Sequence, residues 1–253
     1  MDNLKEIVTT EAKELFQWLQ ISRSSESDRM IDLICKYIQM LIEKNKVMNL
    51  TAIRDVHDIV VRHIEDSFKC VEQIDLLQKE RGEILKVVDL GSGAGLPGII
   101  IGILCPNVQI TMIESTGKKA DFIQEAVDGL ALSNCKIAAV RIEDFANFPG
   151  NKNSCDIITA RALAELRVLC EYAMPLLKIG GTLLAMKSKS WQTELQQAEN
   201  AMHVLGAKYV DSIFYTLTIN DEELHRCFVF LEKLSETPFK YPRSNGIPTK
   251  KPL

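Results

Sequence analysis

The feature that most constrains the fold of this chain is a glycine-rich turn between two apolar runs. The first run, from Ile84 to Leu90, contains the acid Asp89, and four glycines follow within the next eight residues. A second apolar run, from Ile99 to Leu104, comes directly after them. This order predicts a buried strand, a tight turn and a helix, because glycine permits unusual backbone angles and lets a ligand approach bare backbone. The start of the helix would present unpaired N–H groups to that ligand.

The residues of the turn fit two kinds of nucleotide-like ligand. The spacing Gly93-x-Gly95-x-x-Gly98 matches the fingerprint of dinucleotide-binding sites, whereas the longer frame Asp89-x-Gly91-x-Gly93-x-Gly95 resembles the S-adenosylmethionine (SAM) loop of class I methyltransferases. An acid would repel the pyrophosphate of a dinucleotide and attract the sulfonium and ammonium groups of SAM. The turn alone leaves both ligands open, as well as a structural turn that binds neither.

Composition limits the class of protein. The chain has 253 residues, 46% hydrophobic content and a net charge of −4, which suits one sizeable core with an appended subdomain and argues against a general nucleic-acid coat protein. We expect no membrane segment and no signal peptide, and therefore a cytoplasmic protein. Seven cysteines are scattered singly and four histidines show no ligand spacing. We therefore expect reduced cysteines in the core and no metal site.

Hydrophobic periodicity divides the chain into three parts. Residues 1–82 read as an N-terminal helical subdomain, with one helix around residues 30–42 and another over about 55–74. Residues 83–236 alternate strands with helices, which predicts an α/β domain with a mostly parallel sheet. Residues 237–253 form a basic, proline-rich C-terminal tail, with four Lys or Arg and no acid.

Seven strands are expected in the α/β domain, and their order suggests a known kind of sheet. The last two follow each other across a short polar link, so we expect an antiparallel pair at one edge. A seven-stranded, mostly parallel sheet with that ending resembles the Rossmann-like sheet of class I SAM-dependent methyltransferases. The expected strands are 84–90, 108–113, 136–140, 155–160, 182–187, 209–217 and 226–233, and the expected helices between them are 97–104, 117–130, 163–178 and 191–205.

Acids stand at the carboxyl ends of the first three strands, where an open α/β sheet binds its ligands. Glu114 ends the second strand, and its carboxylate suits the ribose hydroxyls of an adenosine ligand. After the third strand, Ile142 and Glu143 provide the apolar residue and the acid that methyltransferases typically place beside an adenine ring and its amino group. In series with Asp89, these residues favour SAM over a nicotinamide cofactor.

Cations end the fourth and fifth strands, at Arg161 and Lys187. Two cations beside a cleft need anionic partners. Arg161 should not face a sulfonium, which leaves a protein acid, the methionine carboxylate of the cofactor or an RNA phosphate as its partner. Surface cations that cap strand ends are the alternative for both residues.

Several motifs in order along nearly the whole chain resemble one family. They are Asn49-Leu50-Thr51, Arg62-His63-x-x-Asp66-Ser67, the loop from Asp89 to Gly98 with its Leu96-Pro97 variant, Glu114-Ser115-x-x-Lys118-Lys119, Arg141-x-Glu143, Asp156-x-x-x-x-Arg161-Ala162 and Met186-Lys187. Together they resemble the bacterial small-subunit ribosomal RNA guanine-N7 methyltransferase family, also called glucose-inhibited division protein B. The basic tail is similar to that of many members.

The resemblance implies an enzyme that transfers a methyl group from SAM to guanine N7 in 16S ribosomal RNA of the small subunit, and we expect a monomer that uses neither DNA nor a membrane. It implies SAM contacts at Gly91, Leu96, Ile142, Glu143 and Arg161. To these the residue chemistry adds further positions, so that the expected cofactor-binding residues are Asp89, Gly91, Gly93, Gly95, Leu96, Glu114, Ile142, Glu143 and Arg161.

Guanine N7 carries a lone pair and no proton, so its methylation needs no general base. We therefore expect catalysis by positioning, with Arg161 or Lys187 as the residue that donates to guanine O6 or to a neighbouring phosphate. The expected RNA-binding residues are Asn49, Arg62, His63, Lys187, Lys240, Arg243, Lys250 and Lys251.

Several alternatives remain open from the sequence. The tail could instead be a disordered extension, and Arg62 and His63 a helix-surface pair held by Asp66. For the whole chain, the alternatives are a small-molecule methyltransferase, a non-catalytic RNA-binding assembly factor and a nicotinamide oxidoreductase.

Overall fold

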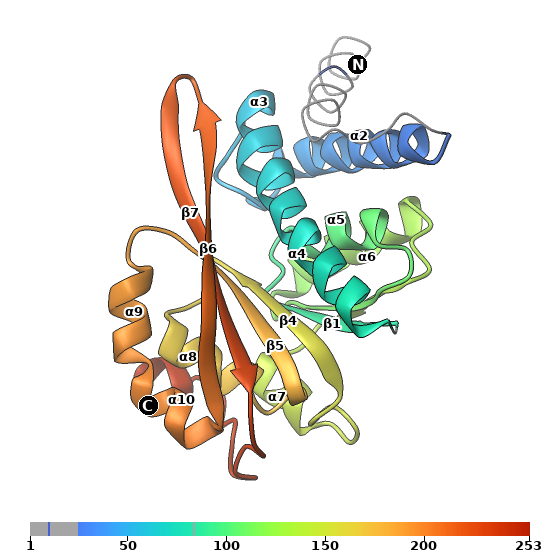
Figure 1. Ribbon diagram of the computed structural model, residues 1–253. Helices are drawn as coiled ribbons and strands as arrows, with labels where there is room; N and C mark the ends of the chain where they lie inside the picture. The colour runs from blue at the N-terminus through green and yellow to red at the C-terminus, as the bar shows by residue number, and fades with distance from the viewer. Residues whose placement is uncertain (1–9, 11–24, 83) are drawn as a thin grey trace.

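A central sheet with helices on both faces forms the molecule (Figure 1). The computed structural model describes residue 10 and residues 25–82 and 84–253, so most of the predicted helical region before residue 25 lies outside the described residues. The strands are β1 Lys86–Leu90, β2 Gln109–Ile113, β3 Cys135–Ala138, β4 Cys155–Arg161, β5 Leu177–Lys187, β6 Ala207–Ile219 and β7 Glu222–Lys233. The helices are α2 Ser25–Asn45, α3 Val56–Ile59, the π-helix η1 Val60–Glu65, α4 Asp66–Arg81, α5 Gly98–Leu104, α6 Gly117–Gly129, α7 Ile142–Asn147, α8 Leu166–Ala173, α9 Trp191–Gln197, α10 Glu199–Leu205 and α11 Ile247–Lys250.

The strand order confirms the predicted fold class. The seven strands run in the order β3-β2-β1-β4-β5-β7-β6. Neighbours from β3 to β5 are parallel, while β7 is antiparallel to both β5 and β6. The order reverses between β1 and β4, and in open α/β sheets the crevice at that switch point is where ligands bind. The glycine turn follows β1, so the fold places it at this crevice.

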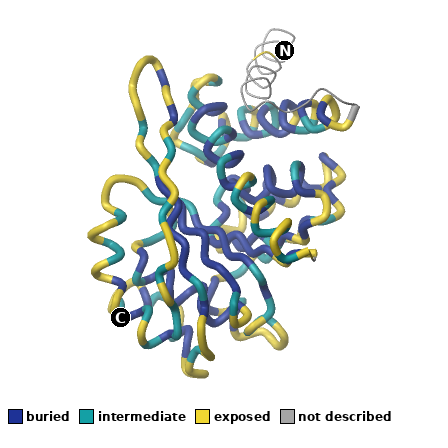
Figure 2. Tube along the Cα trace, in the orientation of Figure 1, coloured by how far each residue is buried: buried dark blue, intermediate teal, exposed yellow. Residues whose placement is uncertain are grey.

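Alternating side chains of the strands fill two separate cores, one on each face of the sheet. Val87, Ile157 and Leu184 belong to the core that α2, α4, α5 and α6 cover. Their neighbours Val88 and Ile158 belong to the core beneath α8 and α10. Successive residues of a strand point to opposite faces, so apolar residues at consecutive positions produce a sheet that is buried on both sides (Figure 2).

The N-terminal helices pack directly on the α/β domain. Ile34, Ile38 and Leu41 of α2 are fully buried and lie in the same core cluster as β1 and α5. The segments α3, η1 and α4 form one continuous helical run from residue 56 to 81. We expected this helix to end near residue 74. The prediction stopped too early because the last turn of the helix is polar and shows no apolar periodicity. The helix ends at Gly82, which has a φ of 67°.

Three other boundaries differ from the expectation. Helix α8 ends at Ala173, and β5 begins at Leu177, within the expected helix 163–178. The expected helix 191–205 is two helices, α9 and α10. Strands β6 and β7 extend beyond their expected ends and project past the rest of the sheet as a hairpin with an exposed tip (Figures 1 and 2). Leu217 and Ile219 on this hairpin pack against Val61 of η1, a contact that sequence periodicity does not reveal.

The seven cysteines are all buried, as predicted. Among the described residues, no helix is long and apolar enough to cross a membrane. In the same part of the chain, no group of three His, Cys, Asp or Glu is placed to hold a metal ion.

Candidate active site

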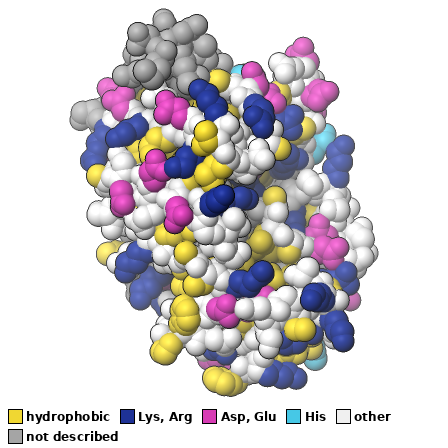
Figure 3. All heavy atoms as spheres, turned by 180° about the vertical axis from the view of Figure 1, so that it is seen from behind, with side chains coloured by type: hydrophobic (Ala, Val, Ile, Leu, Met, Phe, Trp, Pro, Cys, Tyr) yellow, Lys and Arg dark blue, Asp and Glu magenta, His cyan; other side chains and the backbone are white. Residues whose placement is uncertain are grey.

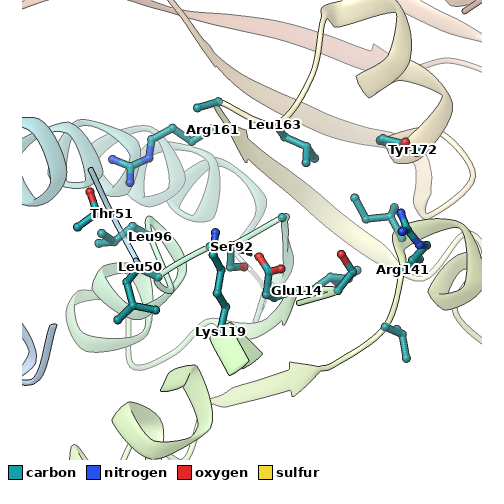
Figure 4. A pocket seen from close by; sticks show the side chains of 18 of the residues that line it. Leu50, Thr51, Ser92, Leu96, Glu114, Lys119, Arg141, Arg161, Leu163 and Tyr172 are labelled. Atoms are coloured by element: carbon teal, nitrogen blue, oxygen red, sulfur yellow. Dashed lines mark hydrogen bonds between the residues drawn. The ribbon is translucent and has the colours of Figure 1, made fainter. Parts of the chain in front are cut away.

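A cavity of about 390 Å³ opens at the carboxyl ends of β1, β2 and β4, which is within the usual size of a small-molecule site. Figure 4 shows side chains from several separate elements around this first cavity. Seven of the nine expected cofactor-binding residues line it: Gly91, Gly93, Leu96, Glu114, Ile142, Glu143 and Arg161. Asp89 and Gly95 are not among the residues that line it.

The glycine turn supplies bare backbone to one wall of the first cavity. Gly91 and Gly93 have φ angles of 65° and 61°, which other residues rarely adopt. A Cβ on Gly91 would lie 2.6 Å from Cδ1 of Leu163, another residue of the wall. The hydroxyl of Tyr37 on α2 donates to the carbonyl of Ala94 at 2.8 Å, so the N-terminal helix braces the turn.

Glu114 is held in place at the end of β2. Its Oε2 accepts from the backbone N–H of Gly93 at 2.9 Å, and its Oε1 accepts from that of Thr116 at 2.7 Å. The side chain is buried at 7% exposure, yet it lines the cavity. Each carboxylate oxygen has two lone pairs, so both can still accept from a ligand. A fixed carboxylate at this point suits a pair of ribose hydroxyls.

Asp89 has a different place from the one expected, because it lies beneath the turn and is fully buried. Its Oδ1 accepts from the hydroxyl of Thr159 at 2.9 Å, and its Oδ2 accepts from the N–H of Gly98 at 3.3 Å. Burial raises the pKa of Asp89 to about 6, against the opposing effect of hydrogen bonds from Ser92 and Thr159. The Asp89 side chain therefore lies below the turn and connects the start of the turn both to its end at Gly98 and to β4.

The N-terminal region contributes a short loop to the first cavity. Asn45 organises this loop, since its Oδ1 accepts from the N–H groups of Leu50 and Thr51 at 2.9 and 3.1 Å. Leu50 and Thr51 line the cavity. The hydroxyl of Thr51 lies 2.8 Å from Nε2 of His63 on η1. Burial, helped by the positive charge of Arg161, lowers the pKa of His63 to about 3, so its ring is neutral near pH 7.

Arg161 joins the sheet to the N-terminal helices. Its Nη1 lies 3.2 Å from Oδ2 of Asp66 and 3.3 Å from the carbonyl of Arg62. The other oxygen of Asp66 accepts from the hydroxyl of Tyr215 on β6 at 2.7 Å. Of the three partners considered for Arg161 from the sequence, the structure supplies a protein acid. Arg161 still lines the first cavity (Figure 4).

A second cavity of about 550 Å³ adjoins the first. The two share four residues: His63, Arg161, Ala162 and Leu163. The cations that line the second cavity are Arg62, Arg161, Lys187 and Arg226. Lys187 is held at 9% side-chain exposure by Oε2 of Glu194, 2.6 Å away, and by the carbonyl of Ala164, 2.7 Å away.

The expected RNA-binding residues fall into two groups. His63, Arg62 and Lys187 line the second cavity, and Asn49 is exposed on the loop that carries Leu50 and Thr51. The other four, Lys240, Arg243, Lys250 and Lys251, lie on residues 237–253, and Arg243 there is paired with Glu171. From behind, basic side chains are spread among acidic ones and form no continuous patch on that face (Figure 3).

Sequence reasoning missed several residues of the first cavity. Tyr172 and Leu163 line it but lay inside an expected helix with no polar motif around them. Ser92, Lys119 and Arg141 belong to motifs that the resemblance used, yet they received no role. Their adjacency to the glycine turn, Glu114 and Glu143 in the sequence was the signal that could have identified them.

Comparisons with known proteins agree with this architecture. The family described as rRNA small subunit methyltransferase G matches residues 30–225. A "Ribosomal RNA small subunit methyltransferase G" of Streptococcus sanguinis is 36% identical over 95% of this chain and 99% of its own length. The protein of that name from Syntrophomonas wolfei is 40% identical over 85% of this chain and 96% of its own length.

Among solved structures, a candidate RNA methyltransferase of Pyrococcus horikoshii shares the fold, with a TM-score of 0.50 at 14% identity over 66% of this chain and 85% of its own. The chain belongs to the rRNA small subunit methyltransferase G family.

Proposed function

We propose that this chain transfers the methyl group of SAM to N7 of a guanine in 16S ribosomal RNA of the small subunit, and that it acts as a monomer. As a member of its family, it is a SAM-dependent methyltransferase of ribosomal RNA. The observation that carries the finer proposal is the pair of adjoining cavities. One is lined by the glycine turn, and the other by four cations together with the acids Asp66, Glu165 and Glu194.

The residues of the first cavity fit SAM. Gly91 and Gly93 offer backbone without side chains, and Glu114 offers a fixed carboxylate for the ribose hydroxyls. Ile142 and Glu143 line the same cavity, and they offer an apolar face and an acceptor that would suit an adenine ring and its amino group. When bound, SAM supplies an electrophilic methyl group on a sulfonium.

The second cavity suits the acceptor nucleotide because it shares a wall with the first. Guanine N7 has an exposed lone pair and no proton, so the chain needs to position this atom and to remove nothing from it. Such positioning can contribute about 7–11 kcal/mol to catalysis. In our proposal, Lys187 or Arg161 donates to guanine O6 or to a phosphate and leaves N7 free.

Backbone phosphates of the RNA would be contacted outside the second cavity. The candidates are the exposed Asn49, together with Arg62 at the cavity rim. Lys240, Lys250 and Lys251 are also exposed and are candidates from the C-terminal residues. These contacts would give binding that weakens as salt concentration rises.

The test is methyl transfer from labelled SAM to small subunits that lack the modification, followed by mapping of the labelled nucleotide. We expect label on N7 of a guanine in 16S rRNA. Label on another RNA atom would contradict the proposed target. Transfer to small molecules alone would favour a small-molecule enzyme, and binding of subunits without transfer would favour a non-catalytic assembly factor.

A lysine pair tests the acceptor contact. The Lys187→Ala variant should lower the rate of transfer about tenfold, since it removes a donor worth about 1.4 kcal/mol. Lys178→Ala is the matched control, because Lys178 also ion-pairs with an acid, Asp156 at 2.7 Å, but does not line either cavity. If both variants kept the full rate on small subunits, Lys187 would have no part in presenting the base.

A further inference from the structure

The C-terminal segment, residues 237–253, is anchored to the helix that carries Tyr172 by a buried ion pair. Arg243 donates through Nε to Oε1 of Glu171 at 2.9 Å and through Nη2 to Oε2 at 2.5 Å. Its backbone N–H also donates to Oε1, at 2.9 Å. Glu171 on α8 is only 1% exposed. A bidentate pair of this kind fixes geometry as well as charge, so Arg243 is engaged within the protein.

Beyond this anchor, the segment touches two residues that line the first cavity. The backbone N–H of Gly246 donates to Oε1 of Glu143 at 2.8 Å. The hydroxyl of Thr249 lies 3.1 Å from that of Tyr172. Asn245 donates to the carboxylate of Asp144, the next residue of α7, at 2.9 Å. The segment thus contacts two residues of the cavity wall, and a neighbour of one of them, from outside the cavity.

The chemistry of Glu143 makes this contact important for ligand choice. The side chain is 4% exposed and lines the first cavity, and the bond from Gly246 occupies its Oε1 and not its Oε2. A carboxylate oxygen accepts a hydrogen bond from an amino group but repels a carbonyl oxygen at the same position. A site built around such an acceptor therefore discriminates strongly between the two groups.

We propose that the C-terminal segment is a positioning element that sets the adenine selectivity of the cofactor site. By holding Glu143 and Tyr172, it keeps the Glu143 carboxylate where it accepts from the exocyclic amino group of the cofactor. This inference rests on the proposed function, since it requires an adenosine cofactor in the first cavity. Gly246 and Thr249 are positioning residues in this scheme, because they act through Glu143 and Tyr172.

The experiment compares two ligands, S-adenosylhomocysteine and S-inosylhomocysteine, in the second of which a carbonyl oxygen replaces the exocyclic amino group and N1 carries a proton. Their dissociation constants are measured by calorimetry for the full chain and for a variant that lacks residues 244–253 and keeps the Arg243–Glu171 pair. We expect the full chain to prefer the adenosine ligand. The deletion should weaken that ligand about tenfold, the value of one charge-assisted hydrogen bond, and the inosine ligand less than about twofold.

Thermal unfolding would show whether the deletion impairs folding. In that case, two substitutions of Thr249 test the same contact with a smaller change. Thr249→Val should reduce the selectivity about threefold because Tyr172 loses a hydrogen-bond partner, whereas Thr249→Ser keeps the hydroxyl and should restore it. A Ser244→Ala variant is the control, since it alters an exposed side chain of the same segment. Its ligand selectivity should match that of the full chain.

The outcomes separate this inference from the proposed function. An equal loss of affinity for both ligands, or no loss for either, would overturn the inference, because the segment would then support the fold alone or nothing in the site. A full chain that binds both ligands equally but still methylates RNA would also overturn it. A full chain that binds neither ligand and transfers no methyl group would instead contradict the proposed function.

Discussion

Two neighbouring cavities meet at His63 and at residues 161–163, and they owe their polar character to different parts of the chain. The first cavity uses bare backbone and a carboxylate held by backbone groups, since Glu114 accepts from the N–H groups of Gly93 and Thr116. The second cavity uses long charged side chains from separate elements, most of them held by acids. Backbone groups therefore give the first cavity its polar character, and tertiary ion pairs give the second cavity its own.

This difference has a consequence for how each cavity tolerates change. A cation that is already paired, such as Arg161 with Asp66, cannot lose its partner without leaving a charge in a poorly solvated place. The backbone wall of the first cavity holds no charge that a substitution could leave without a partner, but it has no room for an added side chain. We therefore expect loss of stability from substitutions in the second cavity and loss of cofactor affinity from substitutions in the first.

The largest effect should come from Asp66→Ala. This change removes the acceptor of both Arg161 and Tyr215, whose bonds to Asp66 are 3.2 and 2.7 Å long. Breaking a buried pair in this way costs about 3 kcal/mol of unfolding free energy, which urea denaturation would measure. Asp58→Ala is the control, since the Asp58–Arg62 pair is 3.4 Å long and more exposed and should contribute less than about 1 kcal/mol. Equal losses in the two variants would break the comparison.

The next largest effect should be a loss of SAM affinity in the Gly91→Ala variant, which alters the first cavity. The alanine would have to adopt a φ of 65°, and its Cβ would lie 2.6 Å from Leu163. Strain of about 2 kcal/mol is then relieved by a shift of the turn, which costs the fit of the wall to SAM. We expect SAM to bind about 30-fold more weakly, as measured by calorimetry. Gly117→Ala is the control, because a Cβ there meets nothing within 4 Å and Gly117 does not line the cavity. Unchanged SAM binding by Gly91→Ala would show that the backbone wall is not a constraint.

The same contrast explains what could be predicted from the sequence. The sheet, the glycine turn and Glu114 follow from local patterns, because apolar runs, glycine spacing and strand ends are properties of adjacent residues. The acid partner of Arg161 was considered among three, but Asp66 could not be selected, since it lies 95 residues away along the chain. Tyr215, at a separation of 149 residues from Asp66, carried no signal.

The sequence also predicted Asp89 as a cofactor-binding residue, whereas the structure buries its side chain away from the residues that line the cavity. Asp89 stands at the frame of the turn as expected, but its carboxylate bonds to Thr159 and Gly98 beneath the turn. Sequence spacing gives the position of the acid in the turn, but it does not show on which side of the backbone the side chain lies. The C-terminal segment is a similar case, since Arg243 was predicted to bind RNA, whereas its side chain forms an ion pair with Glu171.

Near pH 6, the smallest effect on stability should be the one contributed by the titration of His63, which lies on the boundary of both cavities. Its pKa falls from 6.5 to about 3 in the folded chain. Below pH 6.5 the unfolded chain binds a proton that the folded chain does not, so the free energy of unfolding should fall as pH drops from about 6.5 toward 3. The loss is up to about 1.4 kcal/mol per pH unit, and it vanishes above pH 6.5.

A His63→Gln variant should lack this contribution, so its unfolding free energy should converge on that of the unmodified chain, or pass it, as the pH is lowered from 6.5 to 4.5. Every other group titrates in both proteins, and the difference between them isolates His63. His203→Gln, which alters an exposed histidine on α10, should leave the pH dependence in place. Parallel curves for His63→Gln and the unmodified chain would mean that His63 takes up its proton in the folded state, and therefore that water reaches the shared wall of the two cavities.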